Sequence, residues 1–378
     1  MRKVLNVYKL LIDAQGPVFI GSGNEIQKKE YLFLKGNRVG IVDMQKLYQM
    51  VRQKHLTADF ERFMTENVKE DLRRWLERNK ISMAEAVKCM KYTLEAGDME
   101  FEKGKRVQIM EFIKDPYGMP YVPGSSVKGM LRTILLGGDV LRGRERYRND
   151  AREMKAALDE IQGKKRSALI KNIGNIENKR FHTLNRTDNF RDAVNDSMSG
   201  VIVSDSEPLR TEDLILCQKV ERHVDGREKT LNLLRECLRP GTRIVCTLTI
   251  DTSIVRLDAE QLRRDIAEFG QQYYDNFSAK FSGTDRLKAD QAFLGGGSGF
   301  VSKTVIYPIF PGREGVGITR EIFRKTGVPE EHKHRDDMKH GVSPHILKCT
   351  RYQGKSLQMG LCRIQMIPEE LNGTSIRK

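Results

Sequence analysis

The sequence predicts an α+β protein, because strand-like and helix-like patterns occupy separate stretches of the chain. Apolar and polar residues alternate over 4–20, as they do in strands that bury one face. Strand-like runs return at 200–209, 213–223 and 241–251, where we expect them to close a sheet. Over 44–96 and again over 258–282, apolar residues recur at i, i+3 and i+4, which is the spacing of amphipathic helices.

The N-terminal part is expected to begin with strands. The stretch VLNVYKLLIDAQGPVFIGSG predicts a strand that ends in a loop of little steric bulk at 21–23. YLFLKGNRVGIVD predicts a hairpin with Gly36 and Asn37 in its turn. From there to about Ala96 the spacing predicts helices, and Trp75 belongs to their apolar stripe, so we expect it in the core.

The middle and the end of the chain continue this mixture. RVQIMEFIKD (106–115) predicts a strand, and a helix follows at 125–136. The charged tract 137–195 predicts a pair of solvated helices with mobile joints, and a basic arm that faces RNA is the alternative. VIYPIF (305–310) and LQMGLCRIQMI (357–367) have the apolar pattern of strands.

The charge of the chain favours a polyanionic partner. Lys and Arg total 66 and Asp and Glu total 51, which gives a net charge of +15. Such a charge attracts nucleic acid over long range and binds it with release of counterions. Aromatic residues make up only 7% of the chain, which favours contacts along a backbone over stacking on bases. A basic protein without such a partner is the alternative.

The cysteines and the N-terminus indicate a protein of the cytosol. The six cysteines are scattered without a CxxC pair, which predicts reduced and mostly buried thiols. Asn6, Lys9 and Asp13 interrupt the first apolar stretch, unlike the core of a signal peptide. No apolar run approaches the ~18 residues of a membrane span. We therefore expect a cytoplasmic protein that does not enter a membrane.

The stretch YVPGSSVKGMLRTILL (121–136) predicts a helix whose start suits a phosphate. Ser125 or Ser126 is expected to cap the helix, after the turn at Pro123-Gly124. Lys128 and Arg132 are four residues apart and share a face away from the apolar stripe. Free amides, the helix dipole and these two cations would attract an anion together. A structural helix with solvated cations is the alternative.

A second glycine cluster, FLGGGSGFVSKT (293–304), comes close to a Walker A loop without matching it. Ser302 stands where that loop requires glycine before the lysine, and the run that follows has a strand pattern instead of a helix pattern. The sequence therefore disfavours ATP hydrolysis. A bare glycine loop that lets a polyanion or another chain approach the backbone fits better.

Catalytic and metal sites have little support in the sequence. The loop at 332–345 contains His332, His334, His340 and His345, but its spacing matches no known zinc site, so we expect a polar surface loop. Asp205 and Asp188 are candidate general bases for RNA cleavage. Neither has a carboxylate or histidine at a sequence spacing typical of a catalytic pair. A metal-dependent endoribonuclease that uses Asp205 or the histidine loop is therefore the alternative function.

Four short stretches occur here in an order that resembles a known family. They are PVFIGSG, YVPGSSVKGMLRTILL, VIVSDSEPL and FLGGGSGFVSKT. Together they resemble the RAMP superfamily of CRISPR-associated RNA-binding proteins, and within it the family of the fifth subunit of the type III-A (Csm) effector complex. The stretches span about residues 8 to 362, and the helical insertion at 44–97 matches none of them.

This resemblance implies two ferredoxin-like (RRM-like) modules with helical insertions, which we place at 1–252 and 253–378. It also implies a non-catalytic subunit that binds the 3′ region of the guide (CRISPR) RNA, caps a filament of backbone subunits and supports guide maturation in antiviral defence. The implied partners are the guide RNA, the neighbouring RAMP backbone subunit and the small helical subunit of the complex, with a host nuclease as a further candidate. No cofactor, metal or catalytic residue is implied.

The resemblance also indicates which residues would contact RNA. Contacts are expected mainly to phosphate and ribose, because the chain lacks the aromatic signature with which RRM sheets stack bases. Phe300 is a possible stacking residue and Lys303 a phosphate contact. The complete set is Gly21, Ser22, Gly23, Gly124, Ser125, Ser126, Lys128, Gly129, Arg132, Gly295, Gly296, Gly297, Ser298, Gly299, Phe300 and Lys303.

Overall fold

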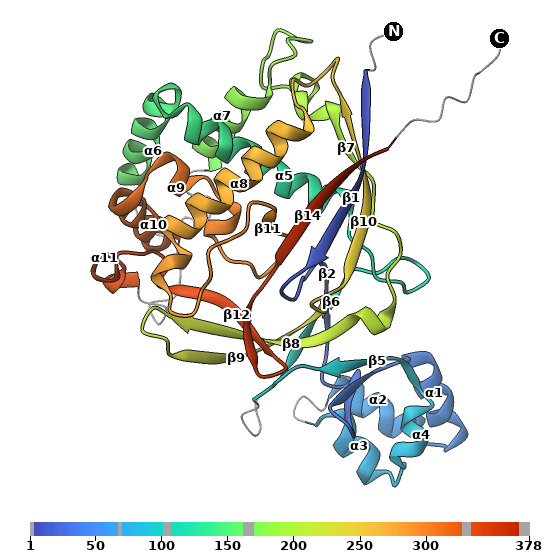
Figure 1. The fold of residues 1–378 in the computed structure, drawn as a ribbon. Helices are drawn as coiled ribbons and strands as arrows, with labels where there is room; N and C mark the ends of the chain where they lie inside the picture. The colour runs from blue at the N-terminus through green and yellow to red at the C-terminus, as the bar shows by residue number, and fades with distance from the viewer. Residues whose placement is uncertain (1–3, 67–69, 101–106, 162–169, 327–333, 370–378) are drawn as a thin grey trace, which may run out of the picture.

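The computed structural model describes residues 4–66, 70–100, 107–161, 170–326 and 334–369. Its strands form two sheets, and its helices pack against them (Figure 1). The α+β class that the sequence predicts is therefore confirmed. Among the described helices, none is both long and apolar enough to cross a membrane.

The first sheet combines strands from both ends of the chain, in the order β11-β14-β1-β10-β7, with every neighbouring pair antiparallel. Leu10 on the central strand lies opposite Cys246 on one side and Met366 on the other. Figure 1 shows the blue N-terminal strand beside the red C-terminal one. The strands are β1 (Leu5–Ala14), β7 (Val201–Val203), β10 (Arg243–Asp251), β11 (Gln291–Phe293) and β14 (Leu361–Glu369).

Strands from both sides of the expected boundary at residue 252 thus share one sheet, and the division into two domains stays a prediction. The boundary itself falls directly after β10. All six cysteines are free and buried, in agreement with the expected reduced thiols.

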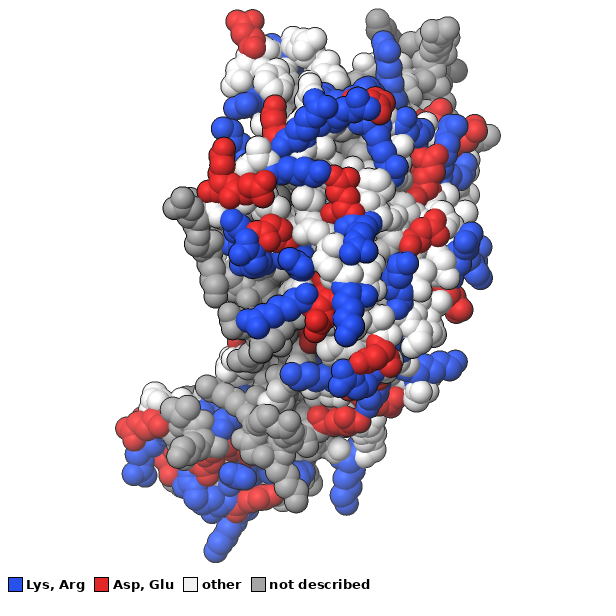
Figure 2. All heavy atoms as spheres, turned by 90° about the vertical axis from the view of Figure 1, so that its left-hand side faces the viewer, with Lys and Arg blue, Asp and Glu red and all other residues white. Residues whose placement is uncertain are grey.

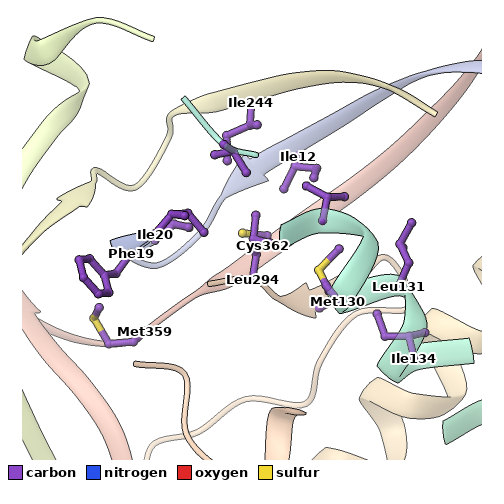
Figure 3. Packing of buried hydrophobic residues seen from close by; sticks show 14 of the residues in the cluster. Ile12, Phe19, Ile20, Met130, Leu131, Ile134, Ile244, Leu294, Met359 and Cys362 are labelled. Carbon is purple, nitrogen blue, oxygen red and sulfur yellow. The ribbon is translucent and has the colours of Figure 1, made fainter. Parts of the chain in front are cut away.

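Two long helices, α5 (Gly124–Arg142) and α8 (Ala259–Asn276), pack against each other and join the apolar core of the first sheet. Figure 3 shows Met130 and Ile134 of α5 near Ile12 of β1 and Cys362 of β14. The expected stripe on α8 is buried, because its members recur on one helix face: Leu262, Ile266, Phe269 and Tyr273.

The second sheet has the order β2-β6-β9-β8-β5-β4-β3, and a hairpin of β12 and β13 adds to it by pairing with β8. The expected turn of the β3–β4 hairpin is confirmed, with positive φ at Gly36 and Asn37. The strands are β2 (Gly21–Ile26), β3 (Tyr31–Leu34), β4 (Arg38–Val42), β5 (Met90–Ala96), β6 (Gln108–Phe112), β8 (Leu214–His223), β9 (Glu228–Leu238), β12 (Ile346–Tyr352) and β13 (Lys355–Gln358).

The helices expected after residue 44 form a small unit with its own core. Trp75 is fully buried there, and its indole N–H donates to Asp59 at 2.9 Å. The helices are α1 (Met44–Gln53), α2 (Thr57–Thr65), α3 (Leu72–Arg78) and α4 (Met83–Val87). The prediction that helix continues to Ala96 is wrong, because 90–96 pairs with β4 and β8 and is held as a strand by those neighbours.

The charged tract contains the expected helix pair, α6 (Arg148–Glu160) and α7 (Ile170–Phe181). The pair is not solvated throughout, since Met154, Leu158 and Ile176 are buried. The residues between these two helices, 162–169, lie outside the described residues, so the expected mobile joints stay a prediction.

The remaining α-helices of the described residues are α9 (Ile306–Ile309), α10 (Gly312–Thr326) and α11 (Asp337–His340). The strand predicted at 305–310 is wrong, because these residues contain α9. Pro308 is compatible with this one-turn helix, where its missing N–H would have had no helical partner. Ile306 and Phe310 are buried, so the apolar run does belong to the core.

Candidate nucleic-acid interface

Three stretches that the sequence singles out meet at one cavity of about 490 Å³. It lies between the start of β2, the first turns of α5 and the loop that follows β11. We call it the glycine pocket, defined by the sequence-predicted residues that line it: Gly21, Ser125, Ser126, Gly129, Gly295, Gly296 and Lys303.

The first turn of α5 differs from its expected form. Helix α5 begins at Gly124 after Pro123, so neither Ser125 nor Ser126 caps it, and that part of the prediction is wrong. The Gly124 N–H instead donates to the Asp205 carboxylate at 2.8 Å. Asp205 thereby neutralises part of the positive potential at the helix start. Ser125 and Ser126, which follow the capped Gly124 amide in the chain, line the glycine pocket.

Gly124 also determines how closely α5 approaches the first sheet. A Cβ at this position would lie 2.2 Å from the carbonyl oxygen of Val203 and 2.7 Å from that of Ser204. Only glycine permits this contact, so the helix start is held directly against the end of β7. Gly129, further along the helix, has open space instead, since no atom apart from its chain neighbours and the adjacent helix backbone lies within 4 Å of the position that a Cβ would take.

Of the two phosphate-binding cations expected on α5, Arg132 is already engaged within the protein. Its guanidinium pairs with Asp196 at 2.7 Å and with Glu177 at 3.3 Å, and it lies 4.3 Å from the centre of the Phe181 ring. Lys128 is half-buried, and loss of solvent lowers its pKa, with Asp196 acting against that shift. Neither side chain lines the glycine pocket, and their contact with RNA stays a prediction.

We expect Arg132→Ala to lower the free energy of unfolding by about 1–2 kcal/mol, because it removes the link from α5 to α7 and to the segment before β7. Urea denaturation measures this change. Lys128→Ala is the matched control, four residues away on the same helix, and should change stability by less than about 0.5 kcal/mol. Equal effects of the two substitutions would contradict the assignment of Arg132 as a structural cation.

The loop after β11 uses its glycines to approach the protein's own chain. Gly295, Gly297 and Gly299 all have positive φ, and the Gly296 N–H donates to the carbonyl oxygen of Phe19 at 2.6 Å. A Cβ on Gly295 would lie 2.3 Å from that same oxygen. At Gly295 and Gly296 the protein's own segment leading into β2 makes the close approach that we expected from a polyanion or another chain. An approach by a polyanion to this loop stays a prediction.

Lys303 contributes an exposed cation to the glycine pocket. Its pKa is lowered, first because the surrounding protein displaces water and second because Arg235 lies nearby. Arg235, on β9, is packed over the Phe19 ring at 5.4 Å and next to Gly297. Sequence reasoning missed Arg235, because a single arginine within an alternating strand carries no signal of its own.

The remaining predicted residues lie beside the glycine pocket instead of in it. Ser22 donates to Glu111 at 3.1 Å, and Gly23 has positive φ with open space around it. Ser298, Gly299 and Phe300 line a second pocket of about 220 Å³. We keep the name second pocket for it, and its other walls include Lys219, Phe323, His334, Pro344 and Lys348.

Basic side chains also gather on the face that carries α6 and α10. Figure 2 shows many Lys and Arg side chains there, interspersed with acidic ones. Arg144, Arg148, Arg152 and Lys155 line a cavity of about 280 Å³ on this face. Arg148 pairs with Glu145, and Lys155 with Glu314, so part of this charge is neutralised internally. The basic arm that faces RNA stays a prediction.

The candidate catalytic aspartates lie outside the one metal-binding cluster found among the described residues. In the part of the chain that the structure describes, neither Asp205 nor Asp188 belongs to a cluster of three His, Cys, Asp or Glu side chains that could hold a metal ion. Within those same residues, such a cluster exists only in the histidine loop. The expected polar surface loop is found only in part: Arg335, Asp336, Lys339 and His340 are exposed, but Asp337 is fully buried and His334 and His345 are mostly so. His332 lies outside the described residues.

Comparison with known proteins gives one consistent result. The model of the RAMP superfamily matches residues 11–334. A Mycobacterium tuberculosis (strain CDC 1551 / Oshkosh) protein named CRISPR system Cms protein Csm5 is 31% identical over 393 aligned positions, which cover 97% of this chain and 99% of that protein. The Streptococcus thermophilus protein of the same name is 27% identical, with 81% and 82% covered.

Two solved structures have a similar fold. A chain of the cryo-EM structure of a Csm–crRNA–target RNA ternary complex from a type III-A CRISPR-Cas system superposes with a TM-score of 0.62 at 18% identity, covering 95% of this chain and all of that one. The crystal structure of T. onnurineus Csm5 gives a TM-score of 0.56 at 17% identity, with 93% and 99% covered. At these identities the likeness concerns the fold alone.

Proposed function

The chain belongs to the RAMP superfamily and, within it, to the Csm5 family of type III-A CRISPR-Cas subunits, and on this basis we propose that it binds guide RNA as a non-catalytic, structural subunit. The observation that supports this proposal most strongly is the glycine pocket. Segments that are about 100 to 280 residues apart in the sequence, at Gly21, Gly129 and Lys303, line it together.

The chemistry of the glycine pocket suits a sugar-phosphate strand. Ser125 and Ser126 supply hydroxyl groups, Lys303 supplies a cation, and the glycines leave room for a backbone to approach. Phosphate and ribose contacts of this kind do not depend on base identity. A subunit that must accept guides of any sequence needs such contacts.

The first sheet supports a ferredoxin-like module as the framework of this site. In chain order β1, α5, β7, β10, α8 and β14 follow the pattern β-α-β-β-α-β. Their strands lie in the order β14-β1-β10-β7, all antiparallel, and α5 and α8 pack together. We propose that these elements form one such module and that a second one lies in the rest of the chain.

We further propose that the RNA bound is the 3′ region of the guide and that the protein caps the filament of RAMP backbone subunits. Its neighbours would be the last backbone subunit and the small helical subunit, and a host nuclease that trims the guide would dock on the same complex. The support is family membership together with the net charge of +15.

The test uses Lys303→Ala and single-stranded RNA. We expect the affinity to fall about three- to tenfold and the slope of log K against log salt to decrease by about 0.7, the value for one phosphate contact on a single strand. Fluorescence anisotropy across a salt series measures both quantities. Lys88→Ala removes an exposed lysine from the helical insertion and should leave both unchanged.

Two results would contradict the proposal. An unchanged salt slope in Lys303→Ala would show that Lys303 does not contact an RNA phosphate. Metal-dependent cleavage of labelled RNA that disappears in Asp205→Asn would establish the endoribonuclease alternative in its place.

A further inference from the structure

The histidine loop folds into a compact cluster that the proposed RNA interface does not use. Asp337 lies at the start of the one-turn helix α11, and His334 and His345 approach its carboxylate from the two sides. The Nδ1 atom of His334 lies 3.1 Å from one carboxylate oxygen, and the Nδ1 atom of His345 contacts the other. The potential ligand atoms of the three residues all lie within 4.8 Å of one another.

While His334 and His345 are neutral, the surroundings of this cluster leave the negative charge of Asp337 unbalanced. The Asp337 side chain has no exposed surface, while His334 and His345 are only 11% and 15% exposed. Both ion-pair partners that the described residues provide for Asp337 are histidines, and a neutral imidazole brings no charge. A buried carboxylate is costly unless it is paired with a cation or coordinates a metal.

Further donors and a route from solvent are present. The rings of His223 and His340 lie 5.7 Å from that of His345. His334 is stacked on Phe323, with ring centres 4.5 Å apart, and both residues line the second pocket. A solvated ion could therefore reach the cluster through that pocket.

We infer that His334, Asp337 and His345 form a binding site for a divalent transition metal of the zinc class. Two imidazole nitrogens and one carboxylate oxygen are a known ligand set of zinc, with a fourth position left for water or another donor. Ligand atoms about 2.0–2.1 Å from a tetrahedral ion are about 3.3 Å apart, close to the His334–Asp337 distance. Small rotations of the two imidazoles would complete the geometry.

Binding requires a defined change in the two imidazoles. In the metal-free arrangement each Nδ1 faces Asp337 and donates its proton there. When the metal takes Nδ1, the proton of each neutral ring moves to Nε2, so no net proton transfer is needed. His334 and His345 remain neutral ligands, and the ion supplies the positive charge that the buried carboxylate lacks.

The test measures metal binding by the full chain without RNA, so its outcome is independent of the proposed function. After treatment with a chelator, the protein is titrated with Zn²⁺ and, separately, with Co²⁺ as a spectroscopic probe. We expect one tightly bound equivalent per chain and the visible absorption of tetrahedral Co²⁺. The double variant His334→Ala/His345→Ala should bind at least about 100-fold more weakly, more than the loss of an outer-shell partner would cause.

The matched control is His55→Asn. His55 is exposed, lies in the insertion, and has positive φ, which asparagine tolerates. This variant should bind like the unmodified protein. If the double variant fails to fold, the Co²⁺ spectrum of the unmodified protein decides: tetrahedral bands support the site, and their absence overturns it. Equal Zn²⁺ affinity of the folded double variant and the unmodified protein would also overturn it.

Discussion

Replacing Gly129 by glutamate is expected to weaken the binding of single-stranded RNA by about 10- to 100-fold, equivalent to about 1.4–2.7 kcal/mol. Gly129 lies on the exposed face of α5 and lines the glycine pocket, where no atom apart from its chain neighbours and the adjacent helix backbone comes within 4 Å of a Cβ position. The new side chain would therefore fit without disturbing the protein. Its carboxylate would occupy the space of the RNA backbone and repel the phosphates.

The control is Gly129→Ala, which adds a methyl group without charge. In a helix interior, alanine is more stable than glycine by about 0.5–1 kcal/mol, so urea denaturation should show a small gain. RNA affinity, measured by anisotropy at a fixed salt concentration, should change less than threefold. If the glutamate variant bound RNA as the unmodified protein does, the glycine pocket could not be the RNA interface.

Gly295→Ala is expected to destabilise the protein by about 2–4 kcal/mol, through two additive causes. The residue has φ +82, which costs a non-glycine residue about 1 kcal/mol. Its Cβ would also lie 2.3 Å from the carbonyl oxygen of Phe19, a backbone atom that cannot move without disturbing the start of β2. Overpacking of this kind typically costs about 1–3 kcal/mol. Urea denaturation gives the total.

The control for the second cause is Gly23→Ala. Gly23 has a similar φ of +92, but nothing lies within 4 Å of its Cβ position. It should therefore lose only the conformational part, about 1 kcal/mol. Similar losses of stability in Gly295→Ala and Gly23→Ala would show that the contact between position 295 and Phe19 adds no cost of its own.

These two experiments separate two uses of glycine that a sequence cannot tell apart. Gly295 is surrounded by its own chain, and its missing side chain permits the protein to close on itself. Gly129 is surrounded by space, and its missing side chain keeps the glycine pocket open. We expect Gly295→Ala to lower the stability of the protein and Gly129→Glu to lower its affinity for RNA.

Local sequence signals account for some of the remaining elements and fail for others. Strand β9 follows β8 through a turn at Asp225-Gly226, a dipeptide that favours tight hairpins, so this pairing does have a local signal. The strand at 90–96 and the helix at 306–309 contradict the local patterns, because pairing partners and burial outweigh weak propensities over such short segments.

Local sequence patterns were enough to predict the α+β class, the apolar stripes of α5 and α8 and the helical insertion with Trp75 in its core, and to single out the three stretches that line the glycine pocket. These follow from periodicity and from residues with special backbone freedom, which act over a few neighbouring positions. Three arrangements became visible only in the folded chain: Asp205 accepts from the Gly124 amide, Arg132 pairs with Asp196, and His334, Asp337 and His345 share one buried cluster. Such contacts join side chains that are brought together by packing. The spacing of two residues in the sequence does not reveal the distance between their side chains in the fold.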